Sequence, residues 1–189
     1  MEKTALKLVL IGGSAGSVDV LVRIVPKLPL NAHFALVLIL HRKPSEDSTL
    51  EDVIAMKSNM QVVPVEDKTM MEPGSIFIAP SDYHLLFEPS GELSLDVSEK
   101  VNYSRPSIDV SFESAAAIYG KGLTAILLTG ANSDGTTGLI SVKERGGFVI
   151  VQDPASANIP FMPANAIENL TPDLVLDVDG IIGFLNSGF

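Results

Sequence analysis

The sequence contains no cysteine, and aromatic residues make up only 6% of its 189 positions. Without cysteine the chain has no disulfide bond, no catalytic thiolate and no cysteine-ligated zinc. It also has no long apolar run, because the longest purely aliphatic stretch, residues 35–40, is far shorter than the roughly 20 residues of a transmembrane helix. The apolar run near the N-terminus is too short for a signal peptide. We therefore expect a cytoplasmic protein without membrane insertion.

Basic residues are scarce as well. The chain has 13 Lys and Arg against 23 Asp and Glu, which gives a net charge of −10 and argues against nucleic acid or an anionic membrane as a partner. Apolar residues make up 46% of the sequence and charged residues 19%, the composition of a globular protein. The length suits one domain, and neither a repeat nor a linker divides it, so we predict a single domain over residues 1–189.

Short apolar segments alternate with helix-like segments along the chain. Strands are predicted at residues 8–11, 34–40, 62–65, 75–79, 123–128 and 148–151, and the main helices at 48–58, 108–119 and 135–145. Residues 84–87 and 93–97 flank a Pro-Ser-Gly turn and indicate an antiparallel hairpin, which we expect to form part of the sheet. The alternation predicts an α/β fold with a doubly wound, mostly parallel sheet and helices on both faces.

Three polar residues, Ser14, His41 and Asp134, each follow one of the predicted strands. Right-handed crossovers bring the carboxyl ends of parallel strands to one edge of a sheet, where ligands and chemistry collect. Serine hydrolysis requires a hydroxyl nucleophile, an imidazole base and a carboxylate that orients the imidazole. The three residues therefore indicate a catalytic triad in which Ser14 attacks, His41 takes the proton and Asp134 orients His41.

Each of these residues also has a purely structural interpretation. Ser14 could be the N-cap of the helix that follows it, and Asp134 could be the N-cap of a helix that starts at Gly135. His41 could be an ordinary strand-end histidine. The chain has only two other histidines: His33 precedes its strand at the opposite end of the sheet, and His84 begins the predicted hairpin. His41 is therefore the preferred base, with His84 as the alternative.

Other chemistries fit the glycine turn less well. The segment Gly12-Gly13-Ser14-Ala15-Gly16 contains G-x-S-x-G, but an α/β-hydrolase has its histidine after the aspartate, not before it. A dinucleotide-binding turn has the pattern G-x-G-x-x-G, and Ser14 stands where its second glycine should be. The sequence also has no P-loop motif, G-x-x-x-x-G-K-S/T. His41, Asp134 and Asp153 lack the spacing of metal ligands. We therefore expect no cofactor.

Several motifs, taken together and in order, resemble one known family. From residue 11 to about 167 the chain is similar to the catalytic domain of the chemotaxis protein-glutamate methylesterases of the CheB type. The matching segments are Ile11-Gly12-Gly13-Ser14-Ala15-Gly16-Ser17, His41, Gly74-Ser75-Ile76-Phe77-Ile78-Ala79-Pro80, Tyr83-His84-Leu85, Arg105-Pro106-Ser107-Ile108-Asp109, Leu128-Thr129-Gly130, Asp134-Gly135, Gln152-Asp153 and Met162-Pro163.

The resemblance implies a doubly wound fold, a Ser-His-Asp triad at Ser14, His41 and Asp134, and no cofactor. It also implies hydrolysis of γ-glutamyl methyl esters on chemoreceptors, or on receptor-like signalling proteins, with deamidation of glutamines as a second activity. The backbone N–H groups of Ala15 and Ala131 would form the oxyanion hole. Ala131 stands where the family commonly has methionine, and Ala15 and Ser17 also depart from the usual first turn.

Two further expectations concern partners. Arg42, Lys43 and Arg105 lie in loops near the predicted site and could dock an acidic receptor surface. Family members usually carry an N-terminal receiver domain, and this chain begins only a few residues before its first strand. We therefore expect no receiver domain here, and a partner could supply one in trans. An alternative function is that of a binding or adaptor module that keeps the fold without catalysis.

Overall fold

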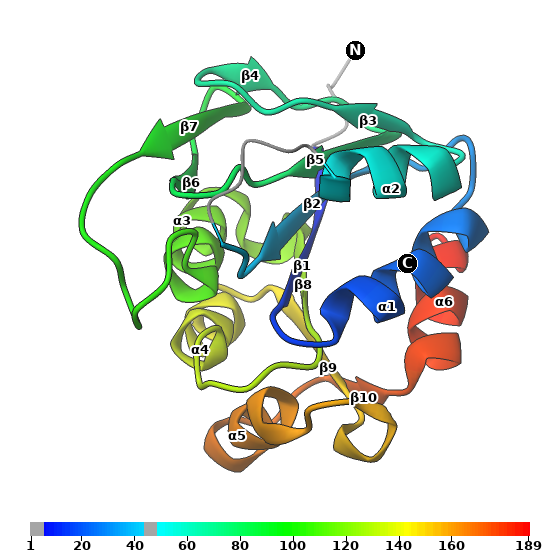
Figure 1. The fold of residues 1–189 in the computed structure, drawn as a ribbon, viewed down its shortest axis with the longest axis vertical. Helices are drawn as coiled ribbons and strands as arrows, with labels where there is room; N and C mark the ends of the chain where they lie inside the picture. The colour runs from blue at the N-terminus through cyan, green and yellow to red at the C-terminus, as the bar shows by residue number, and fades with distance from the viewer. Residues whose placement is uncertain (1–5, 44–48) are drawn as a thin grey trace.

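A seven-stranded parallel sheet runs through the centre of the structure (Figure 1). The computed structural model describes residues 6–43 and 49–189. The strand order is β10-β9-β8-β1-β2-β5-β3, and the paired strands are all parallel. The strands are β1 (Lys7–Gly13), β2 (Phe34–Leu40), β3 (Gln61–Val63), β5 (Ser75–Ile78), β8 (Leu123–Leu127), β9 (Phe148–Gln152) and β10 (Leu174–Leu176).

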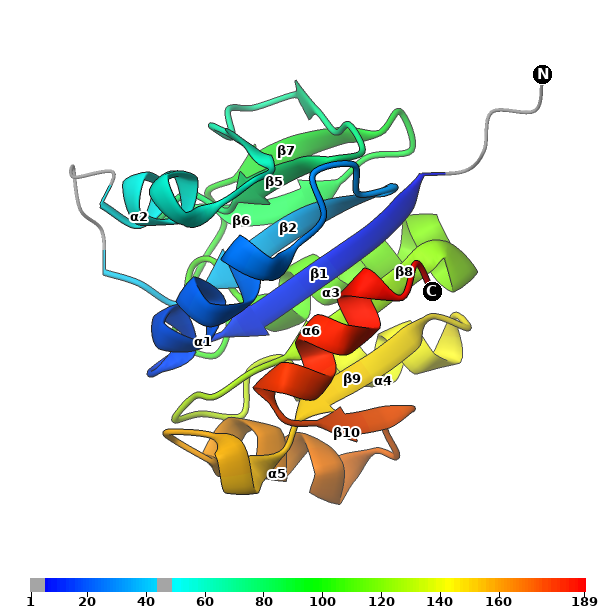
Figure 2. The same ribbon diagram turned by 90° about the vertical axis from the view of Figure 1, so that its right-hand side faces the viewer.

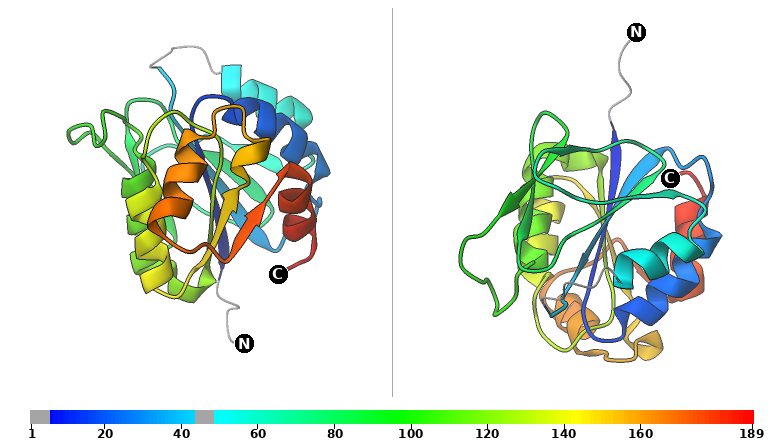
Figure 3. Two further views of the ribbon diagram at one scale, coloured as in Figure 1. Left: turned by 90° about the horizontal axis from the view of Figure 1, so that it is seen from below. Right: turned by 45° about the horizontal axis from the view of Figure 1, so that its top comes forward.

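Helices cover both faces of this sheet, as the sequence predicts. One face carries α1 (Ser17–Ile24), α2 (Thr49–Lys57) and α6 (Val178–Asn186), which lie in front of the strands in Figure 2. The other face carries α3 (Ile108–Tyr119), α4 (Thr136–Glu144) and α5 (Phe161–Asn169). Figure 3 shows the two helical layers on either side of the strands, from below and from the tilted top. Short 3-10 turns lie at Val25–Lys27, Gly120–Gly122 and Pro154–Ser156.

The two layers explain why the central strands are apolar without interruption. All seven residues of β2 are buried, and along β1 successive side chains enter different cores. Leu8 and Leu10 pack toward α3 and α4, whereas Val9 and Ile11 pack toward α1 and α6. A strand that is covered on both faces reads as a continuous hydrophobic run rather than an alternating one.

The predicted hairpin is confirmed, but it does not join the main sheet. β6 (His84–Phe87) and β7 (Glu92–Asp96) pair antiparallel and, with β4 (Thr69–Met70), form a separate three-stranded sheet. The buried side chains of Leu85, Phe87 and Leu93 enter the same core as α3. The hairpin therefore buries its apolar face under α3 instead of adding strands to the edge of the parallel sheet.

The chain passes through the sheet from its centre outward, first to one side and then to the other. β1 lies between β2, which follows it directly, and β8, which comes after the hairpin and α3. The strand order thus reverses between β1 and β8, and such a reversal leaves a crevice outside the carboxyl ends of the strands. Ser14, His41 and Asp134 follow three adjacent strands at this edge.

The helices of the described residues, 6–43 and 49–189, are short. None of them combines the length and the apolar character that are needed to cross a bilayer.

Candidate active site

Ser14 lies in the turn between β1 and α1. Its backbone N–H donates to the carbonyl of Thr129 at 3.0 Å, and its own carbonyl accepts from Oγ of Ser17 at 2.5 Å. Helix α1 has Gly16 as its N-cap, with φ of 83°, where a Cβ atom would come within 2.9 Å of Asn158 Cβ. The N-cap interpretation of Ser14 is therefore wrong. Within the described part of the chain its Oγ makes no hydrogen bond, so the hydroxyl is free for another role.

His41 leaves the neighbouring strand at the same level. Its backbone N–H donates to the carbonyl of Gly13 at 3.1 Å, which fixes the start of this loop beside Ser14. Its Nε2 lies 2.6 Å from Oδ2 of Asp134, and only 11% of its side chain is exposed. Because the carboxylate engages Nε2, the other ring nitrogen, Nδ1, is the one that remains to accept a proton.

Asp134 is fully buried, and its carboxylate lies at the N-terminus of α3, although the residue directly precedes the N-cap of α4 in the sequence. The N-cap of α4 is Gly135, so the N-cap interpretation of Asp134 at that helix is wrong. Instead its carboxylate, besides meeting His41, accepts hydrogen bonds of 2.7–3.1 Å from the backbone of Ile108 and Asp109 and from the side chains of Asn102 and Ser107. A helix N-terminus favours such a negative charge.

This set of donors decides the charge of Asp134. Burial by itself raises the pKa of the carboxyl, but the hydrogen bonds from His41, Asn102 and the backbone of Ile108 and Asp109 outweigh burial and lower the pKa to about 2. Asp134 is therefore ionised at neutral pH. It holds the proton of neutral His41 on Nε2 and stabilises the imidazolium when it forms.

A second carboxyl, Asp109, lies directly behind Asp134. One side-chain nitrogen of Asn102 donates both to Asp109 Oδ2, at 2.8 Å, and to Asp134 Oδ1, at 3.0 Å. Burial raises the pKa of Asp109 to about 6, and the charge of Asp134 acts in the same direction, although the N–H of Gly138 and the Asn102 amide oppose the shift. The two carboxyls thus differ in pKa because Asp134 receives more donors.

The sequence did not single out these supporting residues. Asn102 comes from a loop and has φ of 51°, a left-handed conformation that asparagine tolerates. Ser107 caps α3 through a 3.4 Å bond from the N–H of Val110 and also donates to Asp134 at 3.0 Å. A serine directly before a predicted helix is a recognisable N-cap signal, and Ser107 also lies in one of the segments that carry the family resemblance, but neither sign points to Asp134. Nothing in the sequence joins Asn102 to the site.

The backbone around Ser14 is held by Thr129. Its hydroxyl lies 3.0 Å from the carbonyl of Ala15 and 3.1 Å from that of Ile159, and it accepts from the N–H of Ile159 at 2.8 Å. The backbone N–H groups of Ala15 and Ala131 make no hydrogen bond to any residue that the structure describes. Two donors therefore remain free on the loops that follow β1 and β8.

Asn132 adds a contact to the base itself. Its Nδ2 lies 3.4 Å from Nδ1 of His41, and its Oδ1 accepts from the backbone N–H of Asp134 at 3.1 Å. The side chain thus lies against both members of the His41–Asp134 pair.

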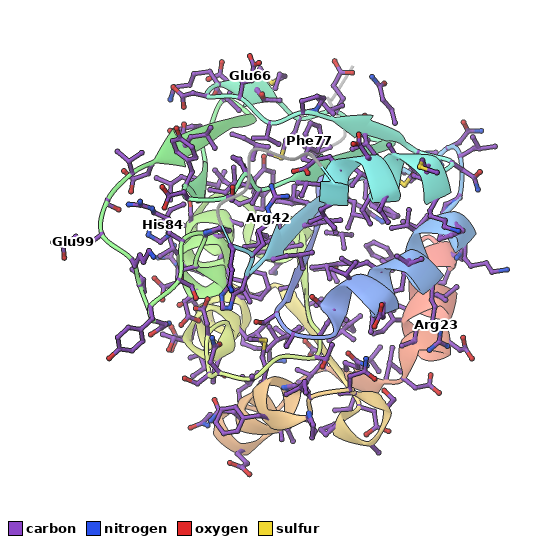
Figure 4. The ribbon with its side chains drawn as sticks, in the orientation of Figure 1. Arg23, Arg42, Glu66, Phe77, His84 and Glu99 are labelled. Atoms are coloured by element: carbon purple, nitrogen blue, oxygen red, sulfur yellow. The ribbon has the colours of Figure 1, made fainter. Side chains whose placement is uncertain are left out.

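His84, the alternative base, is engaged elsewhere. It is fully buried, its Nδ1 accepts from the N–H of Ser107 at 3.2 Å, and its Nε2 lies 2.9 Å from the carbonyl of Glu99. In Figure 4 it lies between α3 and the outer loop that carries Glu99. His84 therefore ties this loop to the start of α3. His33 is exposed just before β2, at the opposite end of the sheet from Ser14.

A cavity of about 310 Å³ opens beside His41, and Arg42, Lys43, Lys100 and Arg105 contribute to its walls. Arg42, labelled beyond the end of β2 in Figure 4, forms a two-point ion pair with Glu51 at 2.6 and 3.0 Å. Arg105 pairs with Asp82 at 2.7 Å and donates to the carbonyls of Val97 and Ser98. Lys43 and Lys100 form no ion pair with any residue that the structure describes.

Asp153 directly follows β9 at the same edge of the sheet as His41 and Asp134. Asp153 caps the 3-10 turn that follows it, by accepting from the N–H of Ala155 at 2.9 Å. Among residues 6–43 and 49–189, no group of three or more His, Cys, Asp or Glu side chains could hold a metal ion.

Comparison with known proteins adds an independent line of evidence. The family model for CheB methylesterase matches residues 9–185. A Leptospira interrogans protein with the provisional name protein-glutamate methylesterase/protein-glutamine glutaminase is 39% identical over 173 residues, which cover 92% of this chain and 90% of that protein. The Thermotoga maritima protein-glutamate methylesterase/protein-glutamine glutaminase is 37% identical, and its match covers 90% of this chain but 50% of its own length.

A solved structure agrees with both sequence matches. The crystal structure of the Thermotoga maritima CheB methylesterase catalytic domain superposes with a TM-score of 0.92 at 35% identity, covering 97% of this chain and 98% of that one. Fold, family model and relatives all agree, and the chain therefore belongs to the CheB methylesterase family of hydrolases.

Proposed function

We propose that this chain hydrolyses glutamyl methyl esters on chemoreceptors or receptor-like signalling proteins through a Ser14–His41–Asp134 triad. The observation that carries the proposal is the 2.6 Å contact between His41 and the buried, ionised Asp134, at the edge of the sheet where Ser14 presents a free hydroxyl. An imidazole oriented by a carboxylate, at the strand end adjacent to that of an unpaired serine, supplies the three groups required for acyl transfer.

The reaction proceeds in two halves. Ser14 Oγ attacks the ester carbonyl while Nδ1 of His41 takes its proton, and the tetrahedral intermediate collapses as His41 returns that proton to the departing methoxide, which leaves as methanol. Water, deprotonated by His41, then attacks the acyl-enzyme. His41 returns this proton to Ser14 Oγ as the second tetrahedral intermediate collapses, and the released glutamic acid ionises to the carboxylate. A glutamine amide follows the same course and releases ammonia.

The oxyanion of each tetrahedral intermediate needs donors beside Ser14. The free backbone N–H groups of Ala15 and Ala131 are the candidates, since the loops that carry them are held by Thr129. A donor of this kind lowers the barrier by about 3 kcal/mol in comparable sites.

Methanol release from a methylated receptor fragment tests this function. Ser14→Ala is expected to abolish release, whereas Ser90→Ala, on the exposed hairpin turn, leaves release unchanged. A fluorophosphonate probe separates the enzyme from a non-catalytic adaptor, because only an activated Ser14 becomes covalently labelled. Methanol release that survives Ser14→Ala, or absence of labelling at high probe concentration, would contradict the proposal.

The charged wall of the cavity suggests how an acidic substrate docks. Arg42 and Arg105 already neutralise Glu51 and Asp82, so they shape the wall, whereas Lys43 and Lys100 keep a charge that a substrate carboxylate could meet. We therefore propose that the docking role expected for Arg42, Lys43 and Arg105 falls mainly on Lys43, together with Lys100.

Substitution of the two lysines tests this docking. The double change Lys43→Glu and Lys100→Glu is expected to raise KM for the receptor fragment several-fold and to leave KM for a small methyl ester unchanged, because only the large substrate spans the cavity. The double change Lys27→Glu and Lys121→Glu, on two exposed 3-10 turns outside the cavity, serves as the matched charge control. Equal effects on both substrates would exclude a docking role.

A further inference from the structure

Asn132 has no role in the mechanism derived so far. It lies in the loop between β8 and α4, half-buried beside the base. Its Oδ1 accepts from the N–H of Asp134 at 3.1 Å, which leaves Nδ2 as the atom that faces His41 Nδ1 at 3.4 Å. The reverse orientation of the amide would place NH2 against the Asp134 N–H, two donors without an acceptor.

The amide meets the ring nitrogen that must stay free for catalysis. Asp134 holds the proton of neutral His41 on Nε2, so Nδ1 carries a lone pair and accepts a hydrogen from Asn132. When His41 is protonated, Nδ1 also carries a hydrogen and then faces another donor. Asn132 therefore stabilises the neutral ring relative to the cation.

We propose that Asn132 is a positioning residue that keeps Nδ1 of His41 unprotonated in the resting site and yields this nitrogen to the Ser14 hydroxyl when catalysis begins. The second half of this statement rests on the proposed function. The separation of 3.4 Å is long for a hydrogen bond, so a hydroxyl donor can replace the amide at little cost. Ser14 and His41 leave adjacent strand ends, which brings the hydroxyl to the same region.

Other charged groups also act on the ring, and they have to be held constant in a test. Asp134 contacts Nε2, and Asp109 lies behind it across Asn102. The cavity beside His41 is lined by further titratable or charged side chains: Arg42, Lys43, Asp82, Lys100, Tyr103 and Arg105. A substitution at position 132 leaves all of these groups in place. A difference in the His41 midpoint between two proteins that differ only at this position therefore measures the effect of the Asn132 amide.

The direct test is an NMR titration of the His41 ring nitrogens in Ser14→Ala protein, with and without Asn132→Ala. The signals of the three histidines are assigned by the loss of one set in His41→Gln. Asn132→Ala is expected to move the midpoint of the His41 titration to higher pH by roughly 0.3 to 0.5 unit, the equivalent of one weak hydrogen bond. Ser133→Ala, on the same exposed loop, is the matched control and leaves the midpoint where it was.

Kinetics with an intact Ser14 provide the second measurement. In Asn132→Ala the rising limb of kcat/KM against pH is expected to move in the same direction, with a plateau within about threefold of the unsubstituted chain. Asn132→Leu, which keeps most of the side-chain volume but has no donor, is expected to move the midpoint in the same direction, so the test survives if the alanine variant does not fold.

An unmoved midpoint in both variants would overturn the proposal. A lower plateau on an unmoved limb would also overturn it, because that result marks a purely structural role. The titration needs no substrate. A shifted midpoint in a chain without esterase activity would therefore contradict the proposed function and leave the role of Asn132 at the ring intact.

Discussion

At the scale of single residues, the contact between His41 and Asp134 uses Nε2 of the ring. The serine proteases that define the triad use the opposite nitrogens, with Nδ1 toward the carboxylate and Nε2 toward the serine. In the proposed mechanism the neutral ring carries its proton on Nε2, and Nδ1 is the base. The hydrogen bond that Asp134 accepts therefore selects the tautomer on which the whole proposed mechanism depends.

Asp134→Asn tests this selection. The amide can donate to Nε2 and so favours the tautomer with the proton on Nδ1, which cannot take a proton from Ser14. We expect kcat to fall about 10⁴-fold, by analogy with the same change in a serine protease, while the fold is retained. The check is the turnover of a small methyl ester together with the circular dichroism spectrum. A loss smaller than about tenfold would remove Asp134 from the triad.

The pH dependence of turnover tests the base. Because His41 must be neutral to accept the proton of Ser14, kcat/KM is expected to rise with pH along one limb within roughly pH 5 to 8 and then to level off. Asp109, whose pKa of about 6 falls in the same range, could produce a limb as well, so Asp109→Asn is the decisive companion variant. A limb that disappears in Asp109→Asn would assign it to the carboxyls instead of His41. His33→Gln, at the far end of the sheet, controls for the loss of an unrelated histidine.

The common position of Ser14, His41 and Asp134 at one edge could be predicted, because each of them follows a buried strand in the sequence. A parallel sheet then brings the carboxyl ends of neighbouring strands close together. The sequence could not place Asn102, which reaches the site from a loop in a left-handed conformation, far from any strand end. Contacts of this kind depend on how the loop folds over α3, and no periodicity or spacing records that.

At the scale of elements, the start of α3 has two functions. Its first backbone N–H groups bind Asp134, which comes from a different strand connection, and its N-cap Ser107 donates to the same carboxylate. His84 in turn accepts from the N–H of Ser107 and joins the hairpin to this end of the helix. Helix α3, predicted at residues 108–119 and found there, therefore orients the catalytic acid of the proposed triad as well as filling the core.

Elements with a strong apolar pattern were the ones that the sequence could predict. The edge strand β10 was missed because its apolar run, Leu174–Leu176, has only three residues, which is shorter than the roughly four to eight of a recognisable strand pattern. The two-residue strand β4 is too short to carry a pattern. Placement of the hairpin outside the main sheet depended on packing against α3, which the local turn signal does not encode.

At the scale of the whole molecule, the two buried carboxyls act on stability in opposite directions. The folded-state pKa of Asp109, about 6, lies above its ordinary value of 3.8, so its contribution to stability is complete below that value and is lost as pH rises through 6. The folded-state pKa of Asp134, about 2, lies below 3.8, so its contribution is present above 3.8 and is lost as pH falls through 2. Between about pH 4 and 7 the Asp109 effect dominates.

Asp109→Asn is therefore expected to flatten the dependence of stability on pH. Between about pH 4.5 and 7.5, the fall in the free energy of unfolding should be smaller in the variant than in the unsubstituted chain, by on the order of 2 kcal/mol. Urea unfolding at the two pH values measures this difference. Asp19→Asn, which removes an exposed carboxylate from α1, controls for the change in net charge. Identical pH dependence in Asp109→Asn and the unsubstituted chain would contradict the assignment.

The hydrogen bonds from the first turn of α3 to Asp134 make the integrity of the proposed triad measurable without substrate. The amide hydrogens of Ile108 and Asp109 are bound to that carboxylate, and they can exchange with deuterium only when the bond opens. Their exchange rates therefore report how often the site comes apart. In Asp134→Ala both amides are expected to exchange much faster, while amides in the middle of β1 stay protected. Two backbone positions thus provide an isotope-exchange readout of the assembled site that applies equally to inactive variants.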